Sequence, residues 1–246
     1  MSVHEVFGRA VAALWERDRI MVDEPGVLAE TVAAAFASGG EGARRASELL
    51  ARSGVRARWN ATLRRDRATA LAARIRPLVS EPLLDVLSGD GSICLALSEI
   101  GVATLAATER SGHYPESVLP STVDFRPFSD DLDFSRFGAS SALLSTVLHH
   151  EPDPAGLLDA LRKGGIDRWI VVENCVTPEF SPSFHQFADR FFNTCLNEFG
   201  AHCVEQHRTL DEWVVLLMRY GTVAIVDDAF PVPGIPFPYS ILVVHA

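Results

Sequence analysis

Hydrophobic residues recur at three- and four-residue steps through the first eighty residues, where no alternating strand pattern is found. The first predicted helix presents an apolar face made of Val6, Val11, Leu14 and Trp15. Three more helices are expected over Val27 to Ala37, Ala43 to Arg52 and about Ala57 to Leu78, separated by Ser38-Gly39-Gly40 and Ser53-Gly54. The pattern therefore predicts a helical lid or cap over residues 1–80.

From Glu81 onward, short runs of Leu, Val and Ile alternate with helical patterns, as in β-α-β units around a mostly parallel sheet. Seven strands are predicted: Leu83 to Leu87, Ala103 to Thr108, Thr122 to Phe125, Ala142 to Val147, Trp169 to Val172, Thr222 to Val226 and Ile241 to His245. Helices are expected to begin near Ser92, Tyr114, Asp131, Asp153, Ser181 and Thr209. Residues 81–246 are thus an α/β domain of Rossmann-like type.

Two segments of this domain depart from simple alternation. The crossover between Val172 and Thr222 is long and carries two helical patterns, which predicts an insertion at about residues 174–208. The Pro-rich residues 231–238 cannot form a regular strand or helix, because each proline lacks an N–H donor and fixes φ. We expect a rigid loop there, joining the last two strands.

Charge and composition narrow the class of protein. The 246 residues carry a formal net charge of −10, which argues against a nucleic acid or an anionic membrane surface as partner. No apolar run reaches the roughly 18–20 residues that span a bilayer, and the N-terminus lacks a signal-peptide pattern, so we expect a cytoplasmic protein. The four cysteines, which show no Cys-x-x-Cys spacing, are expected to be buried free thiols.

The clearest local signal is the strand that begins at Leu83 and runs into the turn Ser88-Gly89-Asp90-Gly91. Glycines in such a turn let backbone approach a ligand at the carboxyl edge of the sheet. Glu109 follows the second predicted strand, where a carboxylate can accept hydrogen bonds from both hydroxyls of a ribose. A nucleoside ligand is therefore expected, although the turn fits neither a dinucleotide motif nor a P-loop.

At this point the sequence resembles the class I S-adenosyl-L-methionine (SAM)-dependent methyltransferases of the small-molecule and ubiquinone-type branch. Leu84-Asp85-Val86-Leu87-Ser88-Gly89-Asp90-Gly91 is similar to the first family motif, with Leu87 at the place of its first glycine. Leu144 to His150, Asp153-Pro154 and Leu161 to Gly165 are similar to the block around the fourth strand. The resemblance implies a sheet with an antiparallel last strand and SAM as the cofactor. It implies these cofactor-binding residues: Asp85, Leu87, Gly89, Gly91, Glu109, Arg110, Asp130 and Ser145.

Candidate acceptor and catalytic residues lie after the fourth strand and in the insertion. His150 or His149 could act as a general base, since an imidazole suits proton transfer at neutral pH, or could simply tie down a loop. Phe184, His185, Arg190 and Asn174 are the predicted acceptor contacts, although a Phe stripe at helical spacing is also typical of a core. No metal is predicted: magnesium at Glu173-Asn174 would find only Glu151 as a second carboxylate.

These observations favour a SAM-dependent methyltransferase that acts on a small organic acceptor at oxygen, of the secondary-metabolite type. Nitrogen or carbon acceptors stay open, since they need positioning more than a base. A methyltransferase-like binding protein without catalysis is the alternative from another class, because a bulky Leu87 would narrow the cofactor pocket. A homodimer is left open.

Overall fold

In the computed structural model, residues 1–102, 105–109, 123–197 and 206–246 are described. The chain divides into two compact units, each built from several stretches of sequence. Unit 1 comprises Met1–Arg67, Val176–Cys203 and Pro231–Pro238, and unit 2 comprises Ala68–Cys175, Val204–Phe230 and Tyr239–Ala246. The boundary at Arg67 falls within one helix, so the predicted cap over residues 1–80 remains a prediction.

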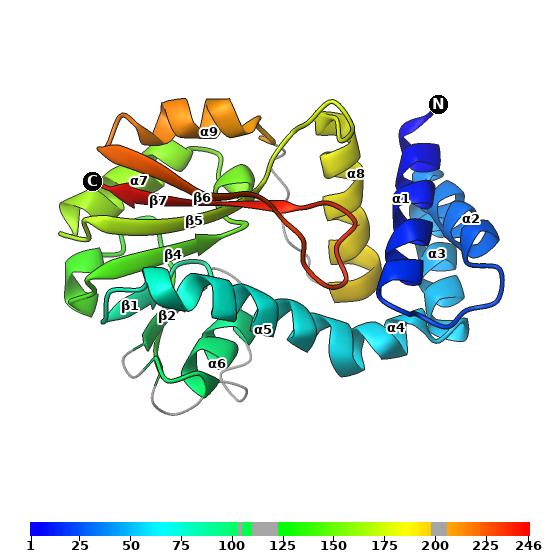
Figure 1. Cartoon of the computed structure of the whole chain (residues 1–246), viewed down its shortest axis with the longest axis horizontal. Coiled ribbons are helices and arrows are strands. Elements are labelled where there is room, and N and C mark those ends of the chain that lie inside the picture. Colours follow the sequence, from blue (N-terminus) through cyan, green and yellow to red (C-terminus); the bar gives the residue numbers. More distant parts are fainter. Residues whose placement is uncertain (103–104, 110–122, 198–205) are drawn as a thin grey trace. The chain divides into compact units, whose positions relative to one another are not determined.

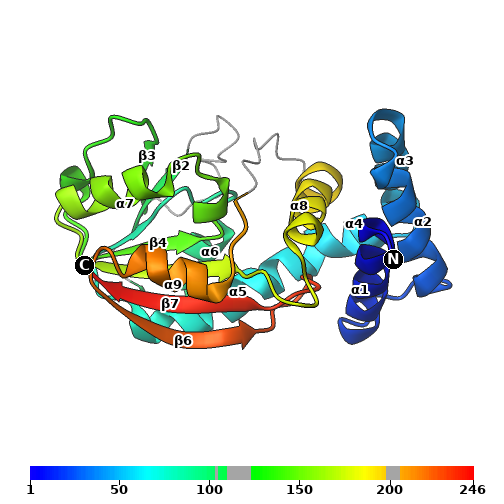
Figure 2. The same ribbon diagram turned by 90° about the horizontal axis from the view of Figure 1, so that it is seen from above.

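Unit 2 is organised around a seven-stranded sheet with the order β3-β2-β1-β4-β5-β7-β6 (Figures 1 and 2). The strands are β1 (Leu83–Asp85), β2 (Leu105–Glu109), β3 (Val123–Pro127), β4 (Ser141–Ser145), β5 (Arg168–Asn174), β6 (Thr222–Phe230) and β7 (Tyr239–His245). Strands β1 to β5 pair in parallel, whereas β7 is antiparallel to both of its neighbours. All seven predicted strands and the antiparallel last strand are confirmed. Residues 103, 104 and 122 of the predicted second and third strands lie outside the described residues.

Helices cover both faces of this sheet (Figure 1). On one face α7 (Pro154–Lys163) and α9 (Leu210–Leu217) pack with Leu84, Leu144 and Trp169 in a single buried cluster. The other face carries α6 (Ser92–Glu99) and the part of α5 (Arg64–Ile75) that follows residue 67. Successive residues of a strand point to opposite faces of the sheet, so an apolar strand packs side chains against the helices on both faces. This explains why residues 169–172 of β5 and 241–244 of β7 are unbroken apolar runs.

Several helix starts are capped by the polar side chains that the sequence places there. Asp153, Ser181 and Thr209 each accept a hydrogen bond from the backbone N–H three residues on. Such N-caps satisfy donors that have no partner within the helix. The predicted helix near Asp131 is wrong: a single 3₁₀ turn, Phe134–Phe137, follows β3 instead, and Gly138 ends it at φ +58°. The expected helix near Tyr114 lies outside the described residues.

Unit 1 contains α1 (Val3–Arg17), α2 (Pro25–Ala37), α3 (Gly40–Arg52), α4 (Val55–Arg58) and α8 (Pro182–Phe191), with a π-helical turn over Trp59–Leu63. Phe7 of α1 lies against the rings of Phe184, Phe187, Phe191 and Phe192, at centroid distances between 4.9 and 6.3 Å. The predicted Phe stripe of the insertion therefore packs as core. No described helix is both long enough and apolar enough to cross a membrane.

The predicted Pro-rich loop is present between β6 and β7, and it belongs to unit 1. Arg17 donates hydrogen bonds to the carbonyl oxygens of Val232 (2.7 Å) and Ile235 (3.2 Å). Asp18 accepts one from the backbone N–H of Gly234 at 2.6 Å. Gly234 has φ +77° and lies so close to Trp59 that a Cβ there would come within 2.5 Å of the indole ring. The end of α1 thus holds a loop that is more than 200 residues away in sequence.

Replacing Gly234 with alanine is expected to lower the free energy of unfolding by about 2–4 kcal/mol, because the methyl group overpacks against Trp59 in a backbone conformation that L-residues disfavour. Gly54→Ala is the matched control, since Gly54 has φ +79° with open space around its Cβ position. Urea denaturation of the two variants separates backbone strain from the clash. Equal losses in both variants would mean that contact with Trp59 has no energetic effect.

Candidate functional site

The turn after β1 has a left-handed backbone at alternate positions. Leu87, Gly89 and Gly91 have φ values of +53°, +59° and +70°. Glycine adopts such angles freely, whereas a leucine there costs about 1–2 kcal/mol. β1 therefore ends at Asp85, two residues before the predicted end of the strand, and Leu87 forms part of the turn. Its half-buried side chain packs against the main core cluster of unit 2, which offsets the strain.

Hydrogen bonds fasten this turn to the end of β2. The backbone N–H of Leu87 donates to Oγ1 of Thr108 at 3.1 Å, and the backbone N–H of Ser88 donates to the carbonyl oxygen of Thr108 at 2.9 Å. The backbone N–H of Gly89 donates to Oε2 of Glu109 at 2.7 Å. A Cβ at Gly89 would meet no atom within 4 Å, so the backbone there borders open space. The predicted glycine turn and the predicted acidic residue thus meet at one edge of the sheet.

Asp85 is buried at the same edge, with only 2% of its surface exposed. Its Oδ2 has no hydrogen-bond partner in the part of the chain that the structure describes. Burial raises the pKa of this carboxyl group to about 8, and the nearby charges of Glu109 and Asp90 act in the same direction. A cation placed beside Asp85 would reverse this effect and favour the carboxylate.

The end of β4 carries a second polar group that lacks a partner. Ser145 Oγ is shielded from solvent and forms no hydrogen bond with the described residues. The next residue, Thr146, has φ +56° and is held by a hydrogen bond from its N–H to the carbonyl oxygen of Val172 at 2.7 Å. Strained residues of this kind persist where surrounding contacts impose them, and they gather at functional sites. β1 and β4 are adjacent parallel strands on either side of the point where the strand order reverses, which is where open α/β sheets bind ligands.

Just beyond β4, His149 pairs with a buried acidic residue. The ring Nδ1 of His149 lies 2.6 Å from Oε2 of Glu173, which is completely buried on β5. The other carboxylate oxygen of Glu173 accepts a hydrogen bond from the backbone N–H of Leu148 at 2.8 Å. A carboxylate at Nδ1 favours the tautomer that carries its proton there and leaves Nε2 as the basic nitrogen. The arrangement can therefore move a proton through Nε2 of His149.

Two further imidazole rings lie next to His149. The ring of His150 is 4.1 Å away between centroids, and the ring of His207 stacks on His149 at 4.8 Å with an interplanar angle of 28°. Gln206 anchors the segment that carries His207, because its N–H donates to the His149 carbonyl oxygen at 3.2 Å and its Nε2 to the Pro152 carbonyl oxygen at 3.1 Å. These contacts restrict the orientation of the His149 ring.

The remaining predicted residues are distributed more widely. Asp130 is exposed beyond the end of β3, and Asn174 is the buried last residue of β5, both in unit 2. In unit 1, Phe184 and His185 are buried on α8, where His185 is surrounded by aromatic rings, including Phe237 at 4.8 Å. Arg190 is exposed on the same helix. Arg110 lies outside the described residues.

The pairing of Glu173 with His149 is not predicted by the sequence. Glu173 stands beside Asn174, which suggests only a magnesium ligand, and 24 residues separate it from His149. The signal that could have found it is the parallel register of β4 and β5, which aligns Ser145 with Val172 and so brings Glu173 to the edge where His149 follows β4.

The stability of the protein should depend on the protonation of Asp85. The carboxyl group titrates near 3.8 when unperturbed and near 8 in the fold, so folding takes up a proton between these values and the free energy of unfolding falls as the pH rises from about 4 to about 8. Asp85→Asn should remove this dependence, and its stability relative to the wild type should rise by a few kcal/mol between pH 5 and pH 8 in urea unfolding.

Asp131→Asn is the control, because a hydrogen bond from Ser129 lowers the pKa of this exposed carboxyl group and it stays ionised across that range. A stability difference between Asp85→Asn and wild type that is constant from pH 5 to pH 8 would contradict a protonated Asp85.

Comparison with known proteins agrees with this architecture. No family model and no curated protein matches the sequence. Among solved structures, the methyltransferase domain of bacterial CtHen1 is 17% identical, covers 75% of this chain and 98% of its own, and has a TM-score of 0.51. The mitomycin 7-O-methyltransferase MmcR is 17% identical, with 97% of this chain and 68% of that chain covered and a TM-score of 0.52. A SAM-dependent methyltransferase from Anabaena variabilis is 13% identical, with coverages of 76% and 87% and a TM-score of 0.52. The chain therefore has the fold of the class I SAM-dependent methyltransferases.

Proposed function

We propose that this protein is a SAM-dependent methyltransferase that transfers a methyl group to an oxygen atom of a small organic acceptor. The observation that carries the proposal is the left-handed turn at Leu87, Gly89 and Gly91, which is fastened to Glu109 at the switch point of the sheet. The sequence of this turn resembles the first family motif, and the backbone at Leu87 is left-handed although leucine stands at the place of the motif's first glycine. The alternative of a closed cofactor pocket loses support, because the Leu87 side chain packs on the core.

The polar groups at this edge fit the cofactor. We expect the Glu109 carboxylate to accept hydrogen bonds from the ribose hydroxyls in addition to the bond that its Oε2 accepts from Gly89. Asp85 and Ser145 both have shielded oxygens without partners among the described residues, as expected where a ligand completes the hydrogen bonding. In this proposal Asp85 pairs with the ammonium group of the cofactor, and Asp130 lies on the side of its adenine ring. When bound, SAM supplies a sulfonium methyl group that an acceptor nucleophile can attack.

His149 is our choice for the general base. Glu173 holds its Nδ1 and so directs the basic Nε2 away from β5, while His207 and Gln206 fix the ring and the backbone. A hydroxyl acceptor must lose a proton during transfer, and an oriented neutral imidazole can take it. Among the predicted acceptor contacts, Arg190 is exposed and could bind an acceptor carboxylate or phosphate bidentately, whereas Phe184 and His185 are buried in the aromatic core of unit 1.

Cofactor binding is the first property to measure, by calorimetric titration with SAM and S-adenosylhomocysteine and with NAD as the negative control. Glu109→Ala should weaken SAM binding about 10- to 100-fold, the equivalent of losing charged hydrogen bonds. Leu87→Gly should keep the affinity because glycine tolerates φ +53°, whereas Leu87→Val should lower it because a β-branched residue cannot hold the turn. Absence of SAM binding, or equal affinities for all three variants, would contradict the cofactor site.

Catalysis should depend on the His149–Glu173 pair once an acceptor is identified by screening hydroxylated small molecules with labelled SAM. His149→Ala should lower kcat about 10²- to 10⁴-fold with little change in SAM affinity, the range for loss of a general base. Glu173→Gln should lower kcat as well, since the amide no longer favours the reactive tautomer. His150→Ala is the matched control at the neighbouring position. A larger loss of kcat in His150→Ala than in His149→Ala would identify His150 as the general base instead. If neither histidine matters, the acceptor needs no base, as for nitrogen or carbon.

A further inference from the structure

Positive charge is concentrated in one part of unit 1, although the chain as a whole has a net charge of −10. Residues 44–67 contain eight of the 22 basic side chains, all arginine, and only two acidic residues, Glu48 and Asp66. This segment covers most of α3 together with α4 and the start of α5. Nothing in the proposed methyl transfer uses these arginines.

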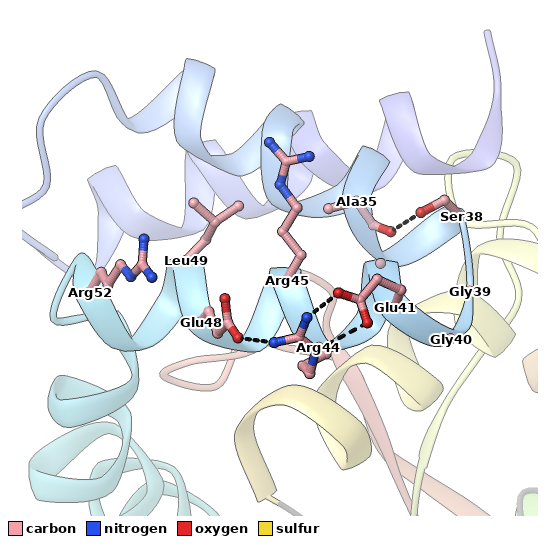
Figure 3. A pocket seen from close by; sticks show the side chains of 11 residues that line it. Ala35, Ser38, Gly39, Gly40, Glu41, Arg44, Arg45, Glu48, Leu49 and Arg52 are labelled. Carbon is pink, nitrogen blue, oxygen red and sulfur yellow. Dashed lines mark hydrogen bonds and ion pairs between the residues drawn. The ribbon is translucent and has the colours of Figure 1, made fainter.

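A groove with a volume of about 620 Å³ runs along α3 where it faces the end of α2, entirely within unit 1 (Figure 3). Ala35 and Leu49 supply apolar lining, and charged side chains of α3 surround them. Exposed arginines, Arg45 and Arg52, lie along its length, so the groove is open to solvent on the side they occupy. It therefore suits an elongated ligand that lies on the surface.

The three arginines of the groove differ in their surroundings. Arg44 is neutralised by ion pairs with Glu41 and with Glu48, the latter at 2.6 Å between Nη1 and Oε1 (Figure 3). Arg45 and Arg52 form no hydrogen bond or ion pair with any residue that the structure describes. Two guanidinium groups are thus available to a ligand, and each can bind a carboxylate bidentately.

The spacing of these groups defines the ligand further. Arg45, Leu49 and Arg52 stand at positions i, i+4 and i+7 of α3, and their side chains point to the same side of the helix (Figure 3). At 1.5 Å of rise per residue, the two arginines start about 10 Å apart along the axis, with an apolar side chain between them. A second α-helix that lies along the groove has the same rise per residue. Carboxylates at its positions i and i+7, with an apolar residue between them, would therefore be spaced like the two arginines.

We propose that this groove binds an acidic amphipathic helix of a partner protein. In helix-in-groove recognition the bound helix makes contact through its positions i, i+3, i+4 and i+7, so carboxylates at i and i+7 with an apolar residue at i+4 can face Arg45, Arg52 and Leu49. A nucleic acid backbone fits less well, because its phosphates recur at every nucleotide and would also meet Glu41 and Glu48, whereas a helix can place its carboxylates opposite Arg45 and Arg52 alone. Sites for small ligands normally enclose most of the ligand surface, and this open groove would not enclose a small ligand in that way. The inference does not depend on the proposed function.

The test uses a fluorescein-labelled, alanine-based helical peptide of about 18 residues with two glutamates seven positions apart and leucines between them. Fluorescence anisotropy with the full-length protein should show binding that weakens several-fold between about 50 mM and about 300 mM salt. The double variant Arg45→Gln/Arg52→Gln should weaken binding at least about tenfold, as expected for losing two charged contacts. Leu49→Gln, which keeps both arginines and adds no charge, should also weaken it.

Arg9→Gln/Arg162→Gln changes the net charge equally at exposed positions outside the groove and should change the affinity less than about twofold. A peptide with glutamines in place of the glutamates should not bind. Equal binding of the two peptides, or equal affinities of the two double variants, would overturn the proposal. So would tighter binding of a short DNA duplex that depends on Arg45 and Arg52, or self-association of the protein in sedimentation that the same two substitutions abolish.

Discussion

The site depends on how the chain leaves β1. Three residues of the following turn adopt left-handed backbone angles, and the N–H groups of two of them, Leu87 and Gly89, would be unsatisfied without the end of β2. Thr108 and Glu109 accept these bonds, so the turn and the second strand form one rigid edge. Leu87 shows how strongly the fold imposes this geometry, because a leucine takes the angle of a glycine and repays the strain by packing on the core.

Burial of acidic groups at the same edge has a chemical consequence. Asp85 lies among apolar strands with Glu109 and Asp90 nearby, and its raised pKa leaves a neutral acid where a cationic ligand would make a carboxylate favourable. Glu173 is equally buried, but the Leu148 N–H and the His149 ring provide it with hydrogen bonds. Two buried carboxyl groups of one sheet thus differ in their surroundings: Glu173 is hydrogen-bonded through both oxygens, whereas Asp85 Oδ2 has no partner among the described residues.

Unit 1 illustrates a different way of assembling a binding surface. Its helices pack on phenylalanines from the N-terminal segment and from the insertion, while Arg17 and Asp18 hold the loop between the last two strands. With the aromatic side chains turned inward, the arginines of α3 and α4 remain on the outside. The apolar face therefore provides stability, and the opposite face carries the arginines on which the proposed helix-binding groove depends.

Most of the secondary-structure elements could be predicted from local sequence patterns. Short runs of Leu, Val and Ile between helical patterns predicted the seven strands, and Asp153, Ser181 and Thr209 marked helix starts because N-capping needs only neighbouring residues. The glycine turn and Glu109 could be predicted because each follows a predicted strand directly and is recognised by its residue type alone, without knowledge of any contact. Tertiary structure alone decided the rest: the strand register that joins His149 to Glu173, the burial that raises the pKa of Asp85, and the left-handed Leu87. Each of these depends on contacts between segments distant in sequence, which local patterns do not encode.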